Sequence, residues 1–350
     1  MRRYVMLLSS MLLASSTAGA QSFAYMYDVA KLKQEKPRYE QRIGDVYGRI
    51  AALLTEPERR ALAGVRIECP LIGAHTGTPV DFYTMGHIRS ATVFMPVLSL
   101  RFLEDLATAF AWLRHHDYSL ETIEAYVTLL RGKKAADFPG GRYPDPLKAL
   151  HIPPDALSEA SVRSLAHAWR DEAYAFILLH EFGHVLSRDP RIDGVPSEVA
   201  RKHEEEADRF ALTVLERGDT NPMGIVLWLM AQANAMPQKG QLTAEGVIKS
   251  EADWQMYVKT WAPHPFTADR LSAIALHFDV WAKRAGREQP RDILTSRAAQ
   301  LTNIAESFRD PEWQSCSAVA ASRSDLATLE PRRIEVAING GPMQAYCEQK

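Results

Sequence analysis

The sequence has few cysteines and no long apolar run. Three cysteines occur in 350 residues, and no two are spaced as Cys-x-x-Cys, which argues against a thiol-redox site and a cysteine-based zinc finger. No stretch of about 18 or more consecutive apolar residues occurs, so no membrane span is expected in the mature chain. GxSxG and GxGxxG motifs are also missing, so the sequence gives no support for a serine hydrolase or a dinucleotide-binding protein.

Charge of one sign is not in excess either. Lysine and arginine total 41 against 43 aspartates and glutamates, a formal net charge of −2. This balance excludes a bulk basic protein that holds nucleic acid by counter-charge. The shares of hydrophobic residues, 46 %, and charged residues, 24 %, are those of a globular chain and exclude a disordered or collagen-like one.

The first 20 residues follow the pattern of a secretion signal. A basic pair is followed by the short apolar run Tyr4–Leu13, and a small-x-small cleavage site ends at Ala20. Gln21 follows the expected cut, so a lipoprotein anchor is not expected. We therefore expect a signal peptide over 1–20 and a mature chain that is periplasmic, or secreted where the host has a single membrane.

Export would also permit disulfides, because they persist in oxidising compartments. Cys316 and Cys347 both lie in the C-terminal tail and are predicted to pair. Cys69 is then the odd thiol, and we expect it to be a small buried apolar residue.

Apolar periodicity predicts a mainly helical chain with one small β-sheet, an α+β fold. The β-leaning runs are Val65–Cys69 and Ala91–Met95, with turn signals between them. The segment 132–155 is rich in proline and glycine and is interpreted as a domain seam or a lid over a site. Helices are predicted over 38–54, 97–116, 119–130, 158–190, 196–218, 221–237, 266–284 and 291–308.

The residues that carry chemistry centre on His180-Glu181-Phe182-Gly183-His184, an HExxH pattern inside a predicted helix. Residues four apart in a helix differ by about 40° in direction, so both imidazoles can reach one ion at the distance zinc requires. Glu181 points about 100° away, where it can take a proton from a water beside the ion. The preceding residues are apolar, and buried polar side chains among them need a partner such as a metal.

A third ligand is expected on the next predicted helix. Glu204 and Asp208 are four residues apart and share a helix face, and Glu204 follows His184 by 20 residues, enough for a loop and a return helix. Glu204 can ligate while Asp208 braces a ligand histidine through its second ring nitrogen. The alternative, a solvated acidic face, is common on helices but weaker behind an HExxH motif. Other histidines, such as His115 and His116, are interpreted as surface residues.

These motifs resemble those of the HtpX and CAAX-prenyl-protease type of gluzincin metallopeptidase, in which HExxH is followed by ExxxD. Asp171–Ala173, Arg217–Pro222 and His264–Arg270 match further family segments in order, the last resembling its HPxxxxR motif. The resemblance covers roughly residues 85–280. It implies a zincin-like peptidase core built on the HExxH helix and the ExxxD helix.

The resemblance also implies the roles of individual residues. One zinc ion per chain would be bound by the two motif histidines, His180 and His184, together with Glu204. Glu181 would be the catalytic base, and Asp208 would hold a ligand histidine through its second ring nitrogen. The roles implied for the His264–Arg270 segment are a catalytic position near the metal for His264 and anchoring of the same loop for Arg270.

The chain departs from the family in two respects. Membrane members carry several spanning helices, and none is expected here. About 80 residues separate the run near 91–95 from the HExxH motif, which suggests an insertion. The expected organisation is a signal peptide over 1–20, a helical and β segment over 21–84, a peptidase domain over 85–285 with an insertion at about 101–157, and a C-terminal helix and disulfide-closed tail over 286–350.

The expected function is a zinc-dependent endopeptidase of the cell envelope that acts on polypeptides in protein quality control, with envelope proteins as partners. The segment 88–95 is predicted to be the edge strand to which an extended substrate adds. The alternative is a non-proteolytic scaffold or chaperone-like factor that keeps the zinc-binding fold, with His264 filling the fourth position on the metal. A third hypothesis is a cytosolic peptidase that cleaves repressor proteins, and the predicted signal peptide argues against it.

Overall fold

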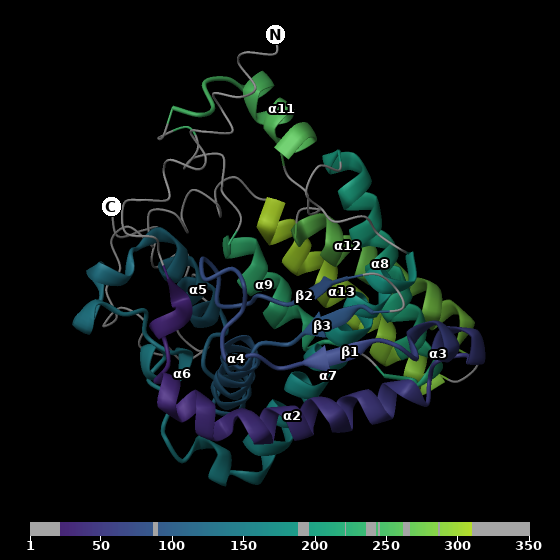
Figure 1. Ribbon diagram of the computed structural model, residues 1–350, viewed down its shortest axis with the longest axis horizontal. Coiled ribbons are helices and arrows are strands. Elements are labelled where there is room, and N and C mark those ends of the chain that lie inside the picture. Colours follow the sequence, from purple (N-terminus) through teal and green to yellow (C-terminus); the bar gives the residue numbers. More distant parts are fainter. Residues whose placement is uncertain are drawn as a thin grey trace.

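The computed structural model describes residues 22–86, 90–187, 196–220, 222–235, 243, 246–261, 267–285 and 288–309. The expected signal peptide, His264 and the Cys316–Cys347 pair lie outside these residues. Within them the chain is mainly helical with one three-stranded sheet, which confirms the predicted α+β class (Figure 1).

The helices and strands follow the predicted order from residue 90 onward, except that the helices over 146–149 and 251–261 were not predicted. The strands are β1 (Arg66–Glu68), β2 (Tyr83–Met85) and β3 (Thr92–Phe94). The helices are α2 (Val29–Ala51), α3 (Glu56–Leu62), α4 (Val97–His115), α5 (Glu121–Gly132), α6 (Pro146–Ala149), α7 (Ala160–Ser187), α8 (Ser197–Arg217), α9 (Ile225–Ala235), α11 (Glu251–Trp261), α12 (Thr267–Arg284) and α13 (Glu288–Arg309), with short 3-10 turns at 23–25, 135–137, 139–141 and 156–158.

Helix α2 begins nine residues earlier than the pattern predicts. Its N-cap is Asp28, whose carboxylate accepts hydrogen bonds from the backbone N–H groups of Ala30 and Lys31 at 2.7 and 3.1 Å. Pro37 then lies inside the helix. Proline removes one helical hydrogen bond and usually ends a helix, which is why the sequence pattern suggested a start only after this residue.

The small sheet has the order β1-β3-β2, with β1 parallel and β2 antiparallel to β3. Strand β3 is therefore the central strand, and its backbone groups are paired on both sides. The prediction that 88–95 forms a substrate-binding edge is wrong for the described residues 90–95. The edge next to α7 is β2, a strand that the sequence pattern does not predict.

The core is built on α4 and α7, which pack antiparallel. Phe110 of α4 stacks on Trp169 of α7 with ring centroids 3.6 Å apart, and the Tyr174 hydroxyl donates to the Leu100 carbonyl. Nearly every residue of α4 is buried. The segment 101–157, expected as an insertion, thus begins inside a helix of the main core. One apolar cluster runs through the described chain from α2 to α13.

A buried carboxylate connects α2 to this helix pair. Glu104 of α4 contacts the guanidinium groups of Arg38, Arg42 and Arg170 and accepts a hydrogen bond from the Tyr39 hydroxyl. Burial disfavours the charged form, but the arginines outweigh it and lower the pKa of Glu104 to about 2. The carboxylate therefore stays ionised and fixes α2 across α4 and α7.

The proline- and glycine-rich segment 132–155 packs against the N-terminal part of the fold. Tyr143 stacks on Phe23 at 4.0 Å between ring centroids, and α6 contacts α4. In Figure 1, α6 lies on the left and α8 on the right. Cys69 is buried with a free thiol, as predicted, and burial raises the pKa of that thiol to about 12.

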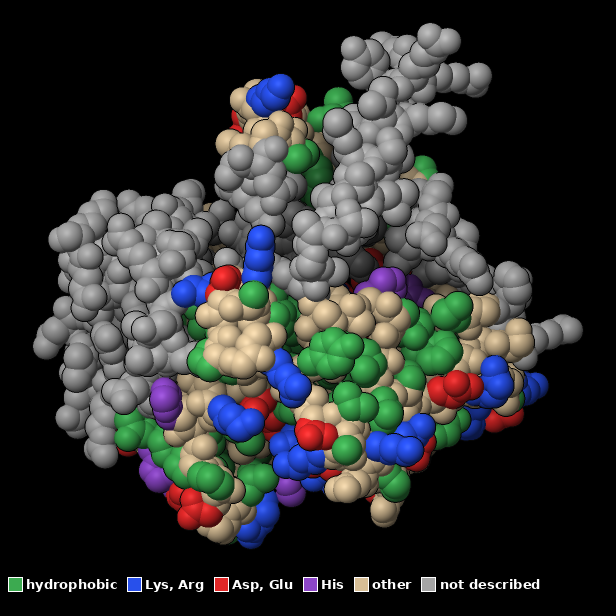
Figure 2. Space-filling model, turned by 60° about the vertical axis from the view of Figure 1, so that its left-hand side comes forward, with side chains coloured by type: hydrophobic (Ala, Val, Ile, Leu, Met, Phe, Trp, Pro, Cys, Tyr) green, Lys and Arg blue, Asp and Glu red, His purple; other side chains and the backbone are tan. Residues whose placement is uncertain are grey.

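The described surface mixes charges of both signs. Figure 2 shows lysines, arginines and acidic side chains interspersed over the exposed part of one face, without a region of a single sign. Among the described residues, none of the helices is both long and apolar enough to cross a bilayer.

Candidate metal centre

The HExxH residues lie in the C-terminal half of α7, where every residue from Ala173 to Gly183 is buried and His184 is partly exposed. His180 and Glu181 are 2 % and 5 % exposed. The Nε2 atoms of His180 and His184 lie 3.1 Å apart, and their rings are perpendicular. Both histidines therefore present a ring nitrogen to one point beside the helix, as the four-residue spacing predicts.

Glu204 of α8 completes a three-ligand group at that point. Its Oε2 is 3.5 Å from His180 Nε2, and its Oε1 is 3.5 Å from His184 Nε2. Ligand atoms at about 2.0–2.1 Å from a tetrahedral zinc ion lie roughly 3.3–3.4 Å from one another. The observed separations and the donor set of two imidazoles and one carboxylate therefore fit a zinc ion. These residues form one of the groups in the described chain that could hold a metal.

Asp208, one helical turn after Glu204, holds the His180 ring by the nitrogen that faces away from the candidate ion. Its Oδ1 accepts a hydrogen bond of 2.8 Å from His180 Nδ1–H. With the Nδ1 proton held there, the Nε2 lone pair faces the candidate ion. Burial disfavours the protonated ring, but hydrogen bonds with Asp208 and Glu204 outweigh it and raise the pKa of His180 to about 9. A proton must leave this ring when a metal binds, so binding is opposed at low pH.

Arg270 of α12 in turn fixes Asp208. Its Nε and Nη2 donate to the two oxygens of Asp208 at 2.8 and 2.7 Å, and its Nη1 donates to Gln232 Oε1. The guanidinium also lies 4.8 Å from the centre of the Trp228 ring, a cation–π contact. Burial opposes ionisation of Asp208, yet Arg270 and His180 hold its pKa below the ordinary value. Asp208 and Arg270 thus form a buried ion pair next to His180.

Glu181 lies beside the ligands and has a partner that the sequence did not reveal. The Thr84 hydroxyl of β2 donates to Glu181 Oε2 at 2.7 Å. This contact positions one carboxylate oxygen and leaves Oε1 for another donor. A threonine in a three-residue strand carries no recognisable signal, so pattern reasoning missed it, as it missed Gln232 and Trp228.

Helices α7 and α8, which carry the candidate ligands, approach closely because of Gly183. A β-carbon at this position would lie 2.7 Å from Ala207 Cα, a separation that real side chains do not adopt. The glycine of the HEFGH sequence therefore has a packing role between α7 and α8, beyond its place in the motif.

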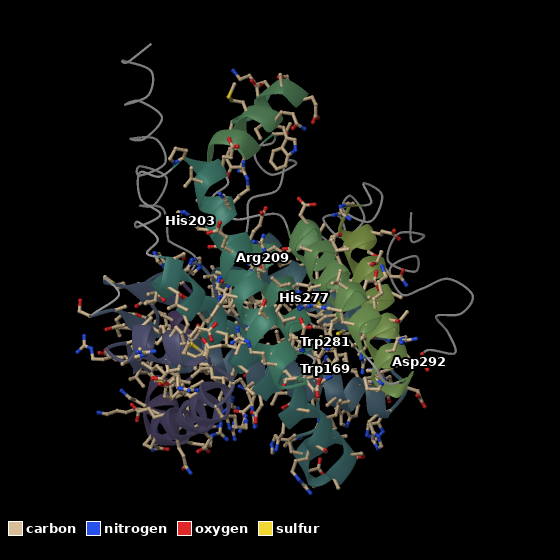
Figure 3. All side chains as sticks on the ribbon, turned by 90° about the vertical axis from the view of Figure 1, so that its right-hand side faces the viewer. Trp169, His203, Arg209, His277, Trp281 and Asp292 are labelled. Carbon is tan, nitrogen blue, oxygen red and sulfur yellow. The ribbon has the colours of Figure 1, made fainter. Side chains whose placement is uncertain are left out.

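A groove of about 340 Å³ lies on the outer side of the Asp208–Arg270 pair, between α8 and α12. Figure 3 shows these helices side by side, with Arg209 of α8 and His277 of α12 labelled, and both residues line the groove. Its lining is mainly apolar and includes Leu276. The buried Asp208–Arg270 pair thus lies between this groove and His180.

The structure brings together the ligands and supporting residues named from the sequence, with the exception of His264, which lies outside the described residues. The comparisons with known proteins add no assignment. No protein-family model, no curated protein and no solved structure matches this chain.

Proposed function

We propose that the chain is a zinc-dependent endopeptidase of the HtpX and CAAX-prenyl-protease type. The observation that carries the proposal is the convergence of His180, His184 and Glu204 on one point, with Glu181 beside them. The Asp208–Arg270 pair behind His180 strengthens it, because a chance HExxH helix would not need an oriented ligand and a buried ion pair.

The three ligands would hold zinc through His180 Nε2, His184 Nε2 and the Glu204 carboxylate. When bound, zinc would supply Lewis-acid polarisation of a peptide carbonyl and of water. Glu181 takes a proton from the attacking water and returns it to the leaving amine nitrogen, while the peptide C–N bond breaks. General acid–base action of this kind contributes about 10²–10⁴ in rate.

The proposed substrate class, polypeptides, is inferred from the position of β2. This strand is the sheet edge nearest α7, and its Thr84 touches the proposed base. An extended polypeptide that adds to an edge strand is held by main-chain hydrogen bonds. A peptide added along β2 would pass beside Glu181, which supports polypeptides as substrates.

The deciding experiment measures bound zinc and proteolysis together. We expect one zinc ion bound at the His180, His184 and Glu204 group of the wild type, and in Glu181→Gln we expect this zinc retained but hydrolysis of an unfolded protein nearly lost. Glu205→Gln is the matched control, because this exposed carboxylate adjoins a ligand on α8 without joining the group. Wild-type activity in Glu181→Gln would overturn the mechanism, and absence of zinc would overturn the site.

Zinc retained without hydrolysis in the wild type would instead favour the scaffold or chaperone-like alternative. The proposed location is the periplasm, or the exterior where the host has one membrane. N-terminal sequencing of the protein from fractionated cells tests it. We expect Gln21 as the first residue, and an intact Met1 in the cytoplasmic fraction would contradict export.

A further inference from the structure

Three metal-ligating side chains also meet at the opposite end of α7. His115 is the last residue of α4, His116 is its C-cap, and Glu159 directly precedes α7. His115 Nε2 lies 3.3 Å from Glu159 Oε2, and His116 Nε2 lies 3.0 Å from Glu159 Oε1. Among the described residues, this is the other group of at least three such side chains whose ligand atoms lie within 4.8 Å of one another.

The end of α4 explains how two consecutive histidines reach one carboxylate. Neighbours in a continuing helix point about 100° apart. Here the helix stops at His116, which has φ −99° and ψ 14°, and Asp117 turns the chain with φ 57°. The ring of Trp112 packs against that of His116 at 4.8 Å between centroids, and Ser161 Oγ lies 3.2 Å from His115 Nε2. Both imidazoles therefore have neighbours that restrict them.

The donor set and spacing suit a transition metal. Two imidazoles and one carboxylate are ligands that Zn²⁺ and Cu²⁺ accept. The separations of 3.0 and 3.3 Å between nitrogen and oxygen resemble the roughly 3.3–3.4 Å expected around a tetrahedral ion. His115, His116 and Glu159 have side-chain exposures of 42 %, 35 % and 37 %. An ion there would be reachable from solvent and would keep positions open for water.

The antiparallel packing of α4 and α7 keeps this cluster away from the HExxH group. Glu159 precedes His180 by 21 residues, which is about 30 Å along a helix. The two groups therefore cannot share an ion, and the side chains of one group can be replaced without changing the other group.

We propose that His115, His116 and Glu159 form a second site for a divalent transition-metal ion, which ties the end of α4 to the start of α7. The ion acts as a clip between two core helices. It binds the folded chain better than the unfolded one, because only folding brings position 159 to the two histidines, and it therefore stabilises the fold.

Zinc alone is the probe for the test. The full chain, stripped of metal, is dialysed against Zn²⁺ buffered in the low micromolar range, and bound zinc is counted by elemental mass spectrometry. We expect two ions in the wild type and one in His115→Gln/His116→Gln. Glu159→Gln should also bind one. His75→Gln is the matched control, since His75 is an exposed histidine paired with a single carboxylate, Asp81, and it should keep two.

A fourth variant, His180→Gln/His184→Gln, separates this proposal from the proposed function. If it keeps one ion that is lost when His115 and His116 are also replaced, the second site stands whatever the protease assay shows. If the wild type binds one ion and His115→Gln/His116→Gln still binds one, the proposal is overturned. No zinc in any of these proteins also overturns it. Circular dichroism checks that each variant is folded, and Glu159→Gln provides an independent variant if the double replacement is not.

Discussion

Gly183 and Ala207 lie in direct contact where α7 passes α8, and no side chain larger than hydrogen fits at position 183. Gly183 immediately precedes the candidate ligand His184, and Ala207 follows the candidate ligand Glu204 by three residues. The closeness of the two helices therefore sets how far the Glu204 carboxylate extends toward the imidazoles. A packing contact and the geometry of the candidate metal group are coupled at this point.

Gly183→Ala should push the helices apart. Overpacking of this kind costs about 1–3 kcal/mol, and we expect a lower free energy of unfolding together with weaker zinc binding. Urea denaturation and competition with a zinc chelator measure the two effects. Gly48→Ala in α2 is the control, because a β-carbon there meets nothing within 4 Å and alanine favours a helix by roughly 0.5–1 kcal/mol over glycine. Equal effects of the two replacements would contradict the contact.

Thr84→Val should affect proteolysis without affecting zinc content. The replacement keeps the shape of the side chain but removes the donor to Glu181 Oε2. Hydrogen bonds to charged groups contribute about 1.5–3 kcal/mol, so kcat should fall about tenfold or more. KM should change little, because the strand backbone is retained. Thr84→Ser restores the hydroxyl and should recover most of kcat. An unchanged kcat in the valine variant would show that this contact does not position the base.

Asp208→Asn should weaken zinc binding while leaving all three ligands in place. The amide cannot act as the anionic acceptor that holds the His180 tautomer and pairs with Arg270. Loss of such a supporting contact typically costs 10–100-fold in metal affinity. Chelator competition gives the zinc dissociation constant. Asp269→Asn serves as the control, since Asp269 is exposed and pairs with Arg309 at the surface. Unaltered affinity in Asp208→Asn would remove the supporting role.

Glu172→Gln should change how stability depends on pH. Burial raises the pKa of Glu172 to about 7, against 4.5 for a free side chain, although its Oε2 accepts a hydrogen bond from Gly224 N–H. Between about pH 4.5 and 7 the folded chain holds a proton that the unfolded chain has released. The free energy of unfolding therefore falls as pH rises through this window.

Glutamine cannot ionise, so the free energy of unfolding of Glu172→Gln does not fall for this reason as the pH rises. Chemical denaturation at pH 5 and pH 8 should show wild-type stability falling more than that of Glu172→Gln, by on the order of 1–3 kcal/mol. Parallel pH profiles of the two proteins would show that Glu172 titrates normally. The other titrating groups are the same in both proteins, so a difference between their pH profiles reports the ionisation of Glu172.

The helical part of the fold could be predicted because its signals are local. The apolar spacing of α4, Pro190 shortly after the end of α7 and Gly218 directly after α8 are signals that act within a few residues. The candidate metal group was predictable for the same reason. Two four-residue spacings put His180 with His184, and Glu204 with Asp208, on shared helix faces.

The contacts between distant segments could not be predicted in this way. Strand β2 has three residues, too few for a period to show, and pairing with β3 rather than local preference makes it a strand. Thr84 reaches Glu181 across 97 residues of sequence. Such a contact depends on how the sheet sits on α7, which no single segment encodes. Helix α11 was likewise missed, although Trp254, Tyr257, Val258 and Trp261 follow helical spacing in the sequence.

The distance along the chain from Asp208 to Arg270 is 62 residues, and this has a consequence for shortened chains. A chain that ends after α9 contains His180, His184 and Glu204 but lacks the guanidinium that orients Asp208. Chains that end before α12 should therefore bind a metal at this group more weakly than the full chain. Metal binding would then depend on a helix that supplies none of the three candidate ligands.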